Sequence, residues 1–166
     1  MINSLDAINI IQRLKSPYDV IIRMAAETGY RISDVLAMKP SDYNRYTQSI
    51  TIKESKTGKT RTVQISNWLA EQLDKRYCET AHYLFYNHSL GRQFTRQTVH
   101  RHLQRAAMRE GIRCSAHSFR KLYAMRLYQQ THDIGAVQEA LNHKYPSTTL
   151  GYLDIDINEL LRASKR

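Results

Sequence analysis

The stretch "SITIKESKTGKTRTVQI", residues 49–65, decides the fold class of this chain. Its two ends, residues 49–54 and 61–65, alternate in polarity and are rich in Ile, Thr and Val, which is typical of β-strands. The segment between them, "SKTGKT", contains Gly58 and supplies a turn. The stretch therefore predicts an antiparallel hairpin.

The remainder of the sequence predicts helices, because apolar residues recur there every three or four positions. Residues 83–87 are a short apolar piece, either a strand or an extended segment. We expect one domain with an α+β fold, mostly helical with a small antiparallel β-sheet. The predicted helices cover residues 4–15, 17–29, 31–38, 67–79, 96–110, 116–130, 134–142, 148–153 and 157–164.

Capping residues and helix breakers set the expected ends of these helices. Pro17 opens the second helix and Gly29 closes it, whereas Pro146 breaks the chain before a short helix near the carboxyl end. In the first helix, Ile8, Ile11 and Leu14 share one face. The expected N-caps are Ser4, Asn67, Thr95 and Ser147.

Size and charge limit the possible functions. The 166 residues suit a single domain, and 25 Lys and Arg against 15 Asp and Glu give a net charge of +10. Such a positive charge favours a polyanionic binding partner, and nucleic acid is the first candidate. Ribosome-bound and membrane-surface proteins carry a similar charge. Neither a membrane span nor a secretory signal is evident. Cys78 and Cys114 are too few for a disulfide framework, which favours a reducing compartment.

The predicted helix at residues 96–110 carries a basic stripe. Val99, Leu103 and Ala106 share one face, and Arg101, Arg105 and Arg109 recur every fourth residue on another. The stripe is either a solvated helix face or a row of phosphate contacts that would make binding strongly dependent on salt. Positive charge nearby comes from Arg92, Arg96, His100 and His102.

His117 and Arg120 lie three residues apart at the start of a predicted helix, so they project from the same side. A guanidinium with its fork of donors, together with an imidazole, can cradle a phosphate. The pair alone is weak evidence, since this spacing often arises by chance.

Further motifs extend this pair along the whole chain. In order they supply an Arg, a Lys, His-x-x-Arg, a His and a Tyr. With this order of motifs the chain resembles the catalytic domain of the tyrosine recombinase, or phage integrase, family. The resemblance covers nearly the whole chain from about Ser4 onward. It rests on "ETGYRISDVLAMK" (27–39), "SKTGKTRTV" (55–63), "HSFRKLYAMRL" (117–127), "VQEALNHKYPSTTLGYL" (137–153) and the connecting residues 83–112.

The resemblance implies a set of groups that bind the scissile phosphate. Arg31 and Arg120 would clamp its non-bridging oxygens. His117 would hydrogen-bond the phosphate and help to accept the tyrosine proton, and His143 would donate a further hydrogen bond. Asp34 would orient its neighbours without reacting.

The resemblance also implies the reacting groups. Tyr152 would be the nucleophile, although without the other motifs it would be interpreted as a core aromatic residue. Tyr123, Tyr128 and Tyr145 do not stand at the matching position. Lys56 would protonate the leaving 5′ oxygen. Lys59 borders the same turn and remains an alternative. The implied chemistry needs no ATP, because the phosphotyrosine keeps the bond energy. It needs no metal or other cofactor either, because the cationic side chains take over the role of a metal.

The expected partner is double-stranded DNA, with no membrane. The family implies a homotetramer on two synapsed duplexes, and we expect a monomer without DNA, in the cytoplasm of a bacterium or encoded by a phage and associated with the nucleoid. Residues 1–166 would form the catalytic domain, without the amino-terminal DNA-binding domain. Two alternatives are a type IB topoisomerase-like DNA relaxase and a DNA-binding module without catalysis. The expected DNA contacts are Arg92, Arg96, Arg101, Arg105 and Lys59.

Overall fold

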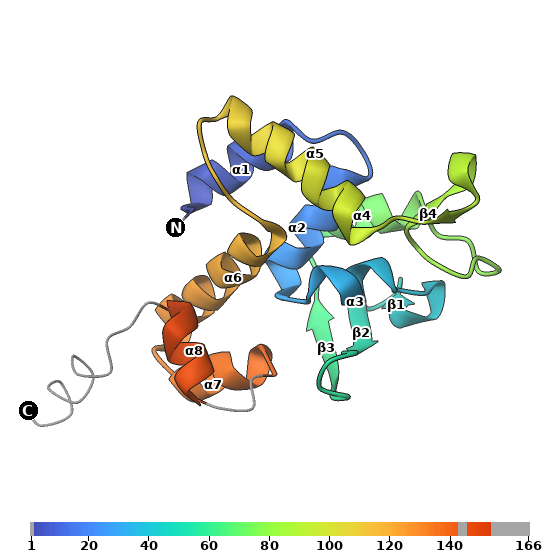
Figure 1. Cartoon of the computed structure of the whole chain (residues 1–166). Coiled ribbons are helices and arrows are strands. Elements are labelled where there is room, and N and C mark those ends of the chain that lie inside the picture. Colours follow the sequence, from blue (N-terminus) through green and yellow to red (C-terminus); the bar gives the residue numbers. More distant parts are fainter. Residues whose placement is uncertain (1, 143–145, 154–166) are drawn as a thin grey trace, which may run out of the picture.

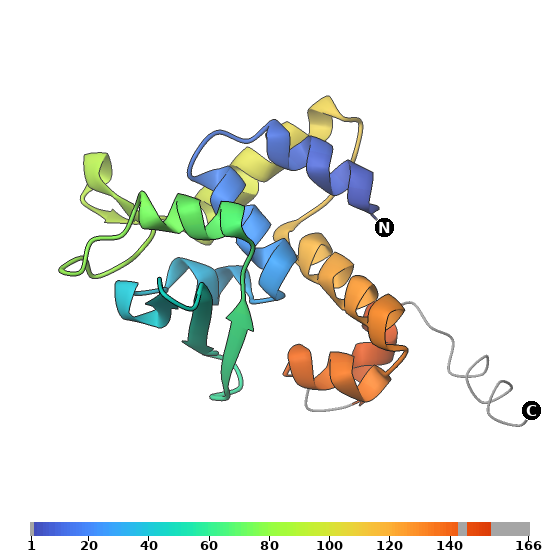
Figure 2. The ribbon, with the colours of Figure 1, turned by 180° about the vertical axis from the view of Figure 1, so that it is seen from behind.

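The computed structural model describes residues 2–142 and 146–153 and is mostly helical, with helix α2 at its centre (Figure 1). Helices α1 and α5 lie together over one end of α2, and α6 runs from α2 toward α7 and α8. From behind, α4 lies on the side of α2 that is hidden in the first view (Figure 2). The helices are α1 (Ser4–Gln12), α2 (Tyr18–Thr28), α3 (Ile32–Leu36), α4 (Asn67–Asp74), α5 (Arg96–Arg109), α6 (Ala116–Thr131), α7 (Ile134–Ala140) and α8 (Pro146–Leu153).

The predicted hairpin is confirmed. Strands β2 (Ser49–Lys53) and β3 (Thr60–Gln64) pair antiparallel. Gly58 adopts a positive φ of 69° in the turn, and its N–H donates to the Glu54 carbonyl at 2.8 Å. A two-residue strand, β1 (Tyr43–Asn44), pairs with the other edge of β2.

The apolar segment at residues 83–87 contributes Leu84 and Phe85 to the core and then continues as β4 (Tyr86–Asn87). This strand forms a separate small hairpin with β5 (Arg92–Gln93). Two short 3-10 turns, at Pro40–Asp42 and His88–Leu90, complete the assignment in the described residues.

The described helices match their predicted positions, but several ends were wrong. Asn3 caps α1 through its hydrogen bond with Asp6, so Ser4 lies inside the helix. Ser66, and not Asn67, caps α4 by accepting a bond from the Leu69 N–H. Two neighbouring residues with capping side chains leave such a choice open in the sequence.

Three further corrections concern helix ends and faces. Helices α1 and α4 end at Gln12 and Asp74, earlier than predicted. Pro146 is the first residue of α8, which suits a residue without an N–H, so Ser147 is not the cap. Ile8 is 49% exposed, because Ala7 and Ile10 form the buried face of α1. The predicted helix at 157–164 lies outside the described residues.

Helix α6 connects two apolar clusters. Phe119 and Leu122, in its first half, belong to the main core that surrounds α2. Ala124 belongs to a smaller cluster in which α7 and α8 pack on α6. The other buried members of the smaller cluster are Val137, Leu141 and Leu153. Leu153 thereby attaches α8 to the fold.

Gly29 is required where α2 meets α6. It ends α2 with a φ of 67°, a conformation that costs other residues about 1–2 kcal/mol. A Cβ atom at Gly29 would also lie 2.4 Å from Cδ1 of Tyr123. The close approach of the two helices therefore depends on the absence of a side chain.

Gly29→Ala is expected to destabilise the fold by about 1–3 kcal/mol more than Gly111→Ala, because only the first substitution overpacks a contact. Gly111 has a φ of 69° and no atom within 4 Å of its would-be Cβ, so it controls for backbone strain alone. Urea unfolding of both variants measures the difference. Equal losses would contradict this account of the α2–α6 contact.

Candidate active site

One open pocket gathers four of the six catalytic residues that the resemblance implies. It lies between the start of α3, the turn of the β2–β3 hairpin, and the first turns of α5 and α6. Arg31 comes from the N-cap of α3, Lys56 from the hairpin turn, and His117 and Arg120 from α6. The pocket thus joins residues that lie up to 89 positions apart and carries several positive charges.

Arg31 stands at the N-cap of α3, and its side chain is 21% exposed. Its Nη1 donates to Oε2 of Glu54. Nε and Nη2 make no hydrogen bond to another residue in the described part of the chain. Arg31 is therefore fixed from one side while its guanidinium lines the pocket.

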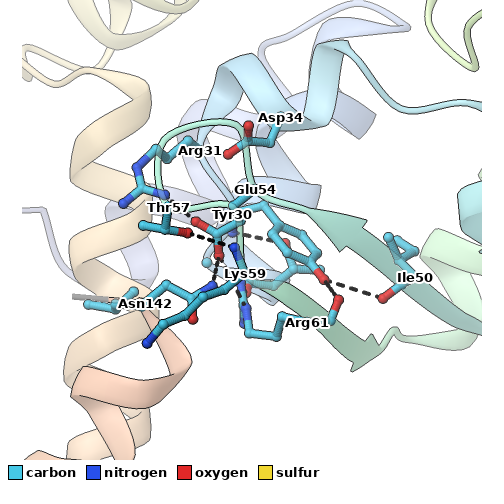
Figure 3. Close-up of polar contacts among 12 residues, drawn as sticks. Tyr30, Arg31, Asp34, Ile50, Glu54, Thr57, Lys59, Arg61 and Asn142 are labelled. Carbon is cyan, nitrogen blue, oxygen red and sulfur yellow. Dashed lines mark hydrogen bonds and ion pairs between the residues drawn. The ribbon is translucent and has the colours of Figure 1, made fainter. Parts of the chain in front are cut away.

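Glu54 is fully buried and holds three side chains together (Figure 3). Besides Arg31, it accepts a hydrogen bond at 2.6 Å from Nδ2 of Asn142, and Nε of Arg61 lies 3.6 Å from Oε1. Glu54 is not among the residues that the sequence motifs predict. The alternation of the strand could have indicated it, because Glu54 continues the buried positions Ile50 and Ile52.

Arg61 points into the protein and ties the hairpin to the end of α2. Its Nη2 donates to the Thr28 carbonyl at 2.7 Å, and its guanidinium lies 4.2 Å from the centroid of the Tyr30 ring. The Tyr30 hydroxyl donates to the Arg61 carbonyl. Burial raises the pKa of Tyr30 to about 12, although Arg61 opposes this shift. Tyr30 thus remains protonated and structural at neutral pH.

Asp34 ties α3 to the hairpin turn. It is 3% exposed and accepts hydrogen bonds from the Ser55 N–H at 3.0 Å and the Ser55 hydroxyl at 2.6 Å. Ser55 directly precedes Lys56, so Asp34 fixes the backbone beside that lysine. This is the orienting role expected of Asp34.

Arg120 is 2% exposed and lies at the carboxyl ends of two helices. Its Nη1 donates to the carbonyl of Gly29, the C-cap of α2, and its Nη2 donates at 2.6 Å to that of Leu141, the C-cap of α7. Helix carboxyl ends carry partial negative charge and stabilise a cation. The inward position of Arg120 thus has a structural reason that the His-x-x-Arg spacing does not reveal.

His117 lies on the first turn of α6 and lines the pocket. Partial burial lowers the pKa of its imidazole, and the positive charges of Arg120, Lys121 and Arg31 lower it further. The imidazole is therefore neutral at pH 7 and can accept a proton.

The hairpin turn and α5 divide their basic residues between the pocket and other surfaces. Lys56 lines the pocket, whereas Lys59 does not. The pocket is also lined by Arg96 and His100, at the start of α5. Exposed basic residues that do not line it are Arg92, Arg101, Arg105 and Arg109.

His102 does not extend the positive surface as expected. It stacks on Tyr18 with ring centroids 3.9 Å apart. Burial lowers its pKa, and Arg101 and Arg105 lower it further. His102 is therefore a neutral packing residue at pH 7.

The remaining predicted residues belong to the carboxyl-terminal part of the chain. Tyr152 belongs to α8, next to the buried Leu153, and His143 lies outside the described residues. Of the competing tyrosines, Tyr123 packs against Gly29 and Tyr128 contacts His132. Neither of these lines the pocket.

Across residues 2–142 and 146–153, no three His, Cys, Asp or Glu side chains group as metal ligands would. None of the described helices is long and apolar enough to cross a membrane.

The chain belongs to the phage integrase family, whose sequence model matches residues 2–159. It is 29% identical over 150 residues to the probable integrase/recombinase YoeC of Bacillus subtilis, covering 89% of this chain and 82% of that protein. Tyrosine recombinase XerA of Pyrococcus furiosus is 27% identical over 164 residues, which cover 96% of this chain and 57% of XerA. The resemblance inferred from the sequence is thereby confirmed.

Solved structures confirm the predicted fold. The crystal structure of XerH site-specific recombinase bound to its difH substrate, in a pre-cleavage complex, superposes with a TM-score of 0.78 at 24% identity. The match covers 98% of this chain and 53% of XerH. The chain therefore spans little more than half the length of XerA and XerH.

His117 is expected to titrate below its ordinary pKa of 6.5 in an NMR titration of the imidazole protons. Lys121→Gln removes one positive neighbour, so it should raise the pKa of His117. The value should nevertheless stay below 6.5, because burial is the larger cause. A pKa at or above 6.5 in the unsubstituted protein would contradict the described surroundings of His117.

Proposed function

We propose that this chain is the catalytic domain of a site-specific DNA recombinase, which cuts and rejoins one strand at a time through a bond between Tyr152 and the 3′ phosphate. The observation that carries the proposal is the pocket shared by Arg31, Lys56, His117 and Arg120. Membership of the phage integrase family supports it.

A phosphodiester is an anion, so an attacking phenolate is repelled until positive donors neutralise the phosphate. In the proposed reaction, Arg31 and Arg120 bind its two non-bridging oxygens. They also stabilise the charge of the transition state. Both guanidiniums are anchored, that of Arg31 by Glu54 and that of Arg120 by two backbone carbonyls. Such anchoring avoids reorganisation during the reaction.

Protons move in opposite directions on the two sides of the phosphorus. Tyr152 gives its proton to neutral His117 as its Oη forms a bond to phosphorus. The bond from phosphorus to the 5′ oxygen breaks, and Lys56 protonates that oxygen. The phosphotyrosine keeps the bond energy, so a 5′ hydroxyl can reverse the reaction, and the proposed steps use no ATP or other cofactor. We assign His143 a further hydrogen bond to the phosphate.

The proposed substrate is double-stranded DNA, and the net charge of +10 supports it. The related XerH has been crystallised on its difH substrate. Arg96 and His100 would bind phosphates next to the pocket. Contacts farther along the duplex would come from Arg92, Arg101, Arg105 and Lys59.

On DNA we propose a homotetramer that joins two duplexes, with residues 1–166 as the catalytic domain of each subunit. We expect the chain to act in the bacterial cytoplasm, where its DNA substrate, bacterial or phage, is found. Relaxation of a supercoiled plasmid without a specific site would favour a type IB topoisomerase-like activity instead. Binding without strand cleavage would favour a DNA-binding module.

The nucleophile can be tested with a library of nicked duplexes of random sequence. Cleavage next to the nick releases a short fragment, so the covalent complex cannot be reversed. The unsubstituted protein is expected to form a complex that survives SDS, whereas Tyr152→Phe should form none. Sequencing of the trapped DNA identifies the target. A covalent complex with Tyr152→Phe would exclude Tyr152 as the nucleophile.

The acid can be tested by replacing the leaving 5′ oxygen with sulfur in the duplex selected above. Sulfur leaves without protonation, because a thiol is far more acidic than an alcohol. Lys56→Ala should slow cleavage of the oxygen substrate by about 10²–10⁴-fold, the usual contribution of a general acid. Cleavage of the sulfur substrate should remain within a few fold of normal. Lys59→Ala is the matched control and should cleave both substrates at a normal rate. Slow cleavage of the oxygen substrate by Lys59→Ala, with normal cleavage of the sulfur substrate, would assign the acid to Lys59.

A further inference from the structure

The two carboxylate oxygens of Glu54 accept hydrogen bonds from two different parts of the molecule. Oε2 accepts from Arg31 at the start of α3. Oε1 accepts from Asn142, 88 residues away, and lies 3.6 Å from Nε of Arg61. The side chain of Glu54 is fully buried at the base of the hairpin turn (Figure 3).

A buried carboxylate is costly unless it is paired, and removing one partner of such a pair is strongly destabilising. Glu54 therefore keeps Arg31, Arg61 and Asn142 in place. One negative charge faces two guanidiniums, so this group keeps a net positive charge next to the pocket. The position of Arg31 thus depends on a residue that lies outside the pocket.

Asn142 directly follows the C-cap of α7 and has a φ of 51°, a left-handed conformation that Asn tolerates better than most residues. It is 7% exposed. Along the chain, Asn142 precedes His143 and the helix that contains Tyr152. Its hydrogen bond to Glu54 therefore joins the hairpin to the start of the segment that leads to the proposed nucleophile.

We propose that Glu54 is a positioning residue for strand cleavage: its buried carboxylate orients Arg31 with one oxygen and, through Asn142, fixes the start of the segment that leads to Tyr152 with the other. This inference rests on the proposed function. It assigns a role to a residue that does not touch the DNA, and it makes the two halves of the site depend on one side chain.

A role for Glu54 as a competitor of the phosphate would predict the opposite change in the cleavage rate. If Glu54 only competed with the phosphate for Arg31, removing its charge would release the guanidinium and speed cleavage. A positioning role predicts slower cleavage, because misplacement by about 1 Å can cost about 10²-fold in rate.

Three single variants separate these roles. Glu54→Gln keeps the shape and an acceptor for Asn142, but it loses the charge that holds Arg31. Asn142→Gly removes the amide without straining the left-handed backbone. Glu110→Gln serves as the control, because it neutralises the acid of the 2.7 Å Arg13–Glu110 ion pair, and neither residue of that pair lines the pocket.

The measurement is the single-turnover rate of covalent complex formation at saturating nicked duplex, taken from the selection above, with DNA affinity measured by fluorescence anisotropy. We expect Glu54→Gln to slow this rate by about 10–100-fold and Asn142→Gly by about 10-fold, with affinity changed less than about threefold. Glu110→Gln should leave both quantities unchanged. A purely structural role would reduce the amount of active protein and leave the rate constant unaltered.

The effects of Glu54→Gln and Asn142→Gly on the cleavage rate should not be additive, because both substitutions weaken the Glu54–Asn142 contact. Adding Asn142→Gly to Glu54→Gln should therefore slow cleavage by a smaller factor than Asn142→Gly does alone. Normal rates in both single variants, or faster cleavage by Glu54→Gln, would overturn the inference while leaving the proposed function intact. If Glu54→Gln does not fold, the rate of Asn142→Gly decides. Absence of a covalent complex with the unsubstituted protein would overturn both proposals.

Discussion

Mutual repulsion between positive side chains is the constraint on which this structure depends. Arg31, Lys56 and Arg120 line one pocket, and each would be more stable apart and in water. The fold offsets the repulsion differently for the two arginines. Arg31 pairs with the buried carboxylate of Glu54, whereas Arg120 donates to carbonyls at the carboxyl ends of α2 and α7. The remaining positive charge of the pocket is what a phosphate would neutralise.

The same contacts explain why distant segments meet. Arg120 joins α2 to α7, and Asp34 joins α3 to the hairpin turn. Glu54 joins the base of the turn to Asn142, the residue after the C-cap of α7. Helix α8 contributes Leu153 to a small apolar cluster with α6 and α7. The pocket is thus built on the main core, while the helix that contains Tyr152 is held by a smaller one.

Local patterns in the sequence were sufficient for much of this fold. Alternation predicted the hairpin, and the spacing of Val99, Leu103 and Ala106 predicted the buried face of α5. Two-residue strands such as β1 and β5 are too short to leave a pattern. The motif order predicted four residues that line the pocket, because it reflects shared chemistry. It could not reveal Glu54 or Asn142, whose contact joins positions 88 residues apart.

A crystal structure of the domain bound to a duplex that contains its cleavage site would test the central claim most directly. We predict that one backbone phosphate lies between Arg31 and Arg120, within hydrogen-bond distance of both guanidiniums, with His117 and Lys56 beside it. A duplex bound along the outer face of α5, with Arg101 and Arg105 on its phosphates and no phosphate in the pocket, would contradict the account.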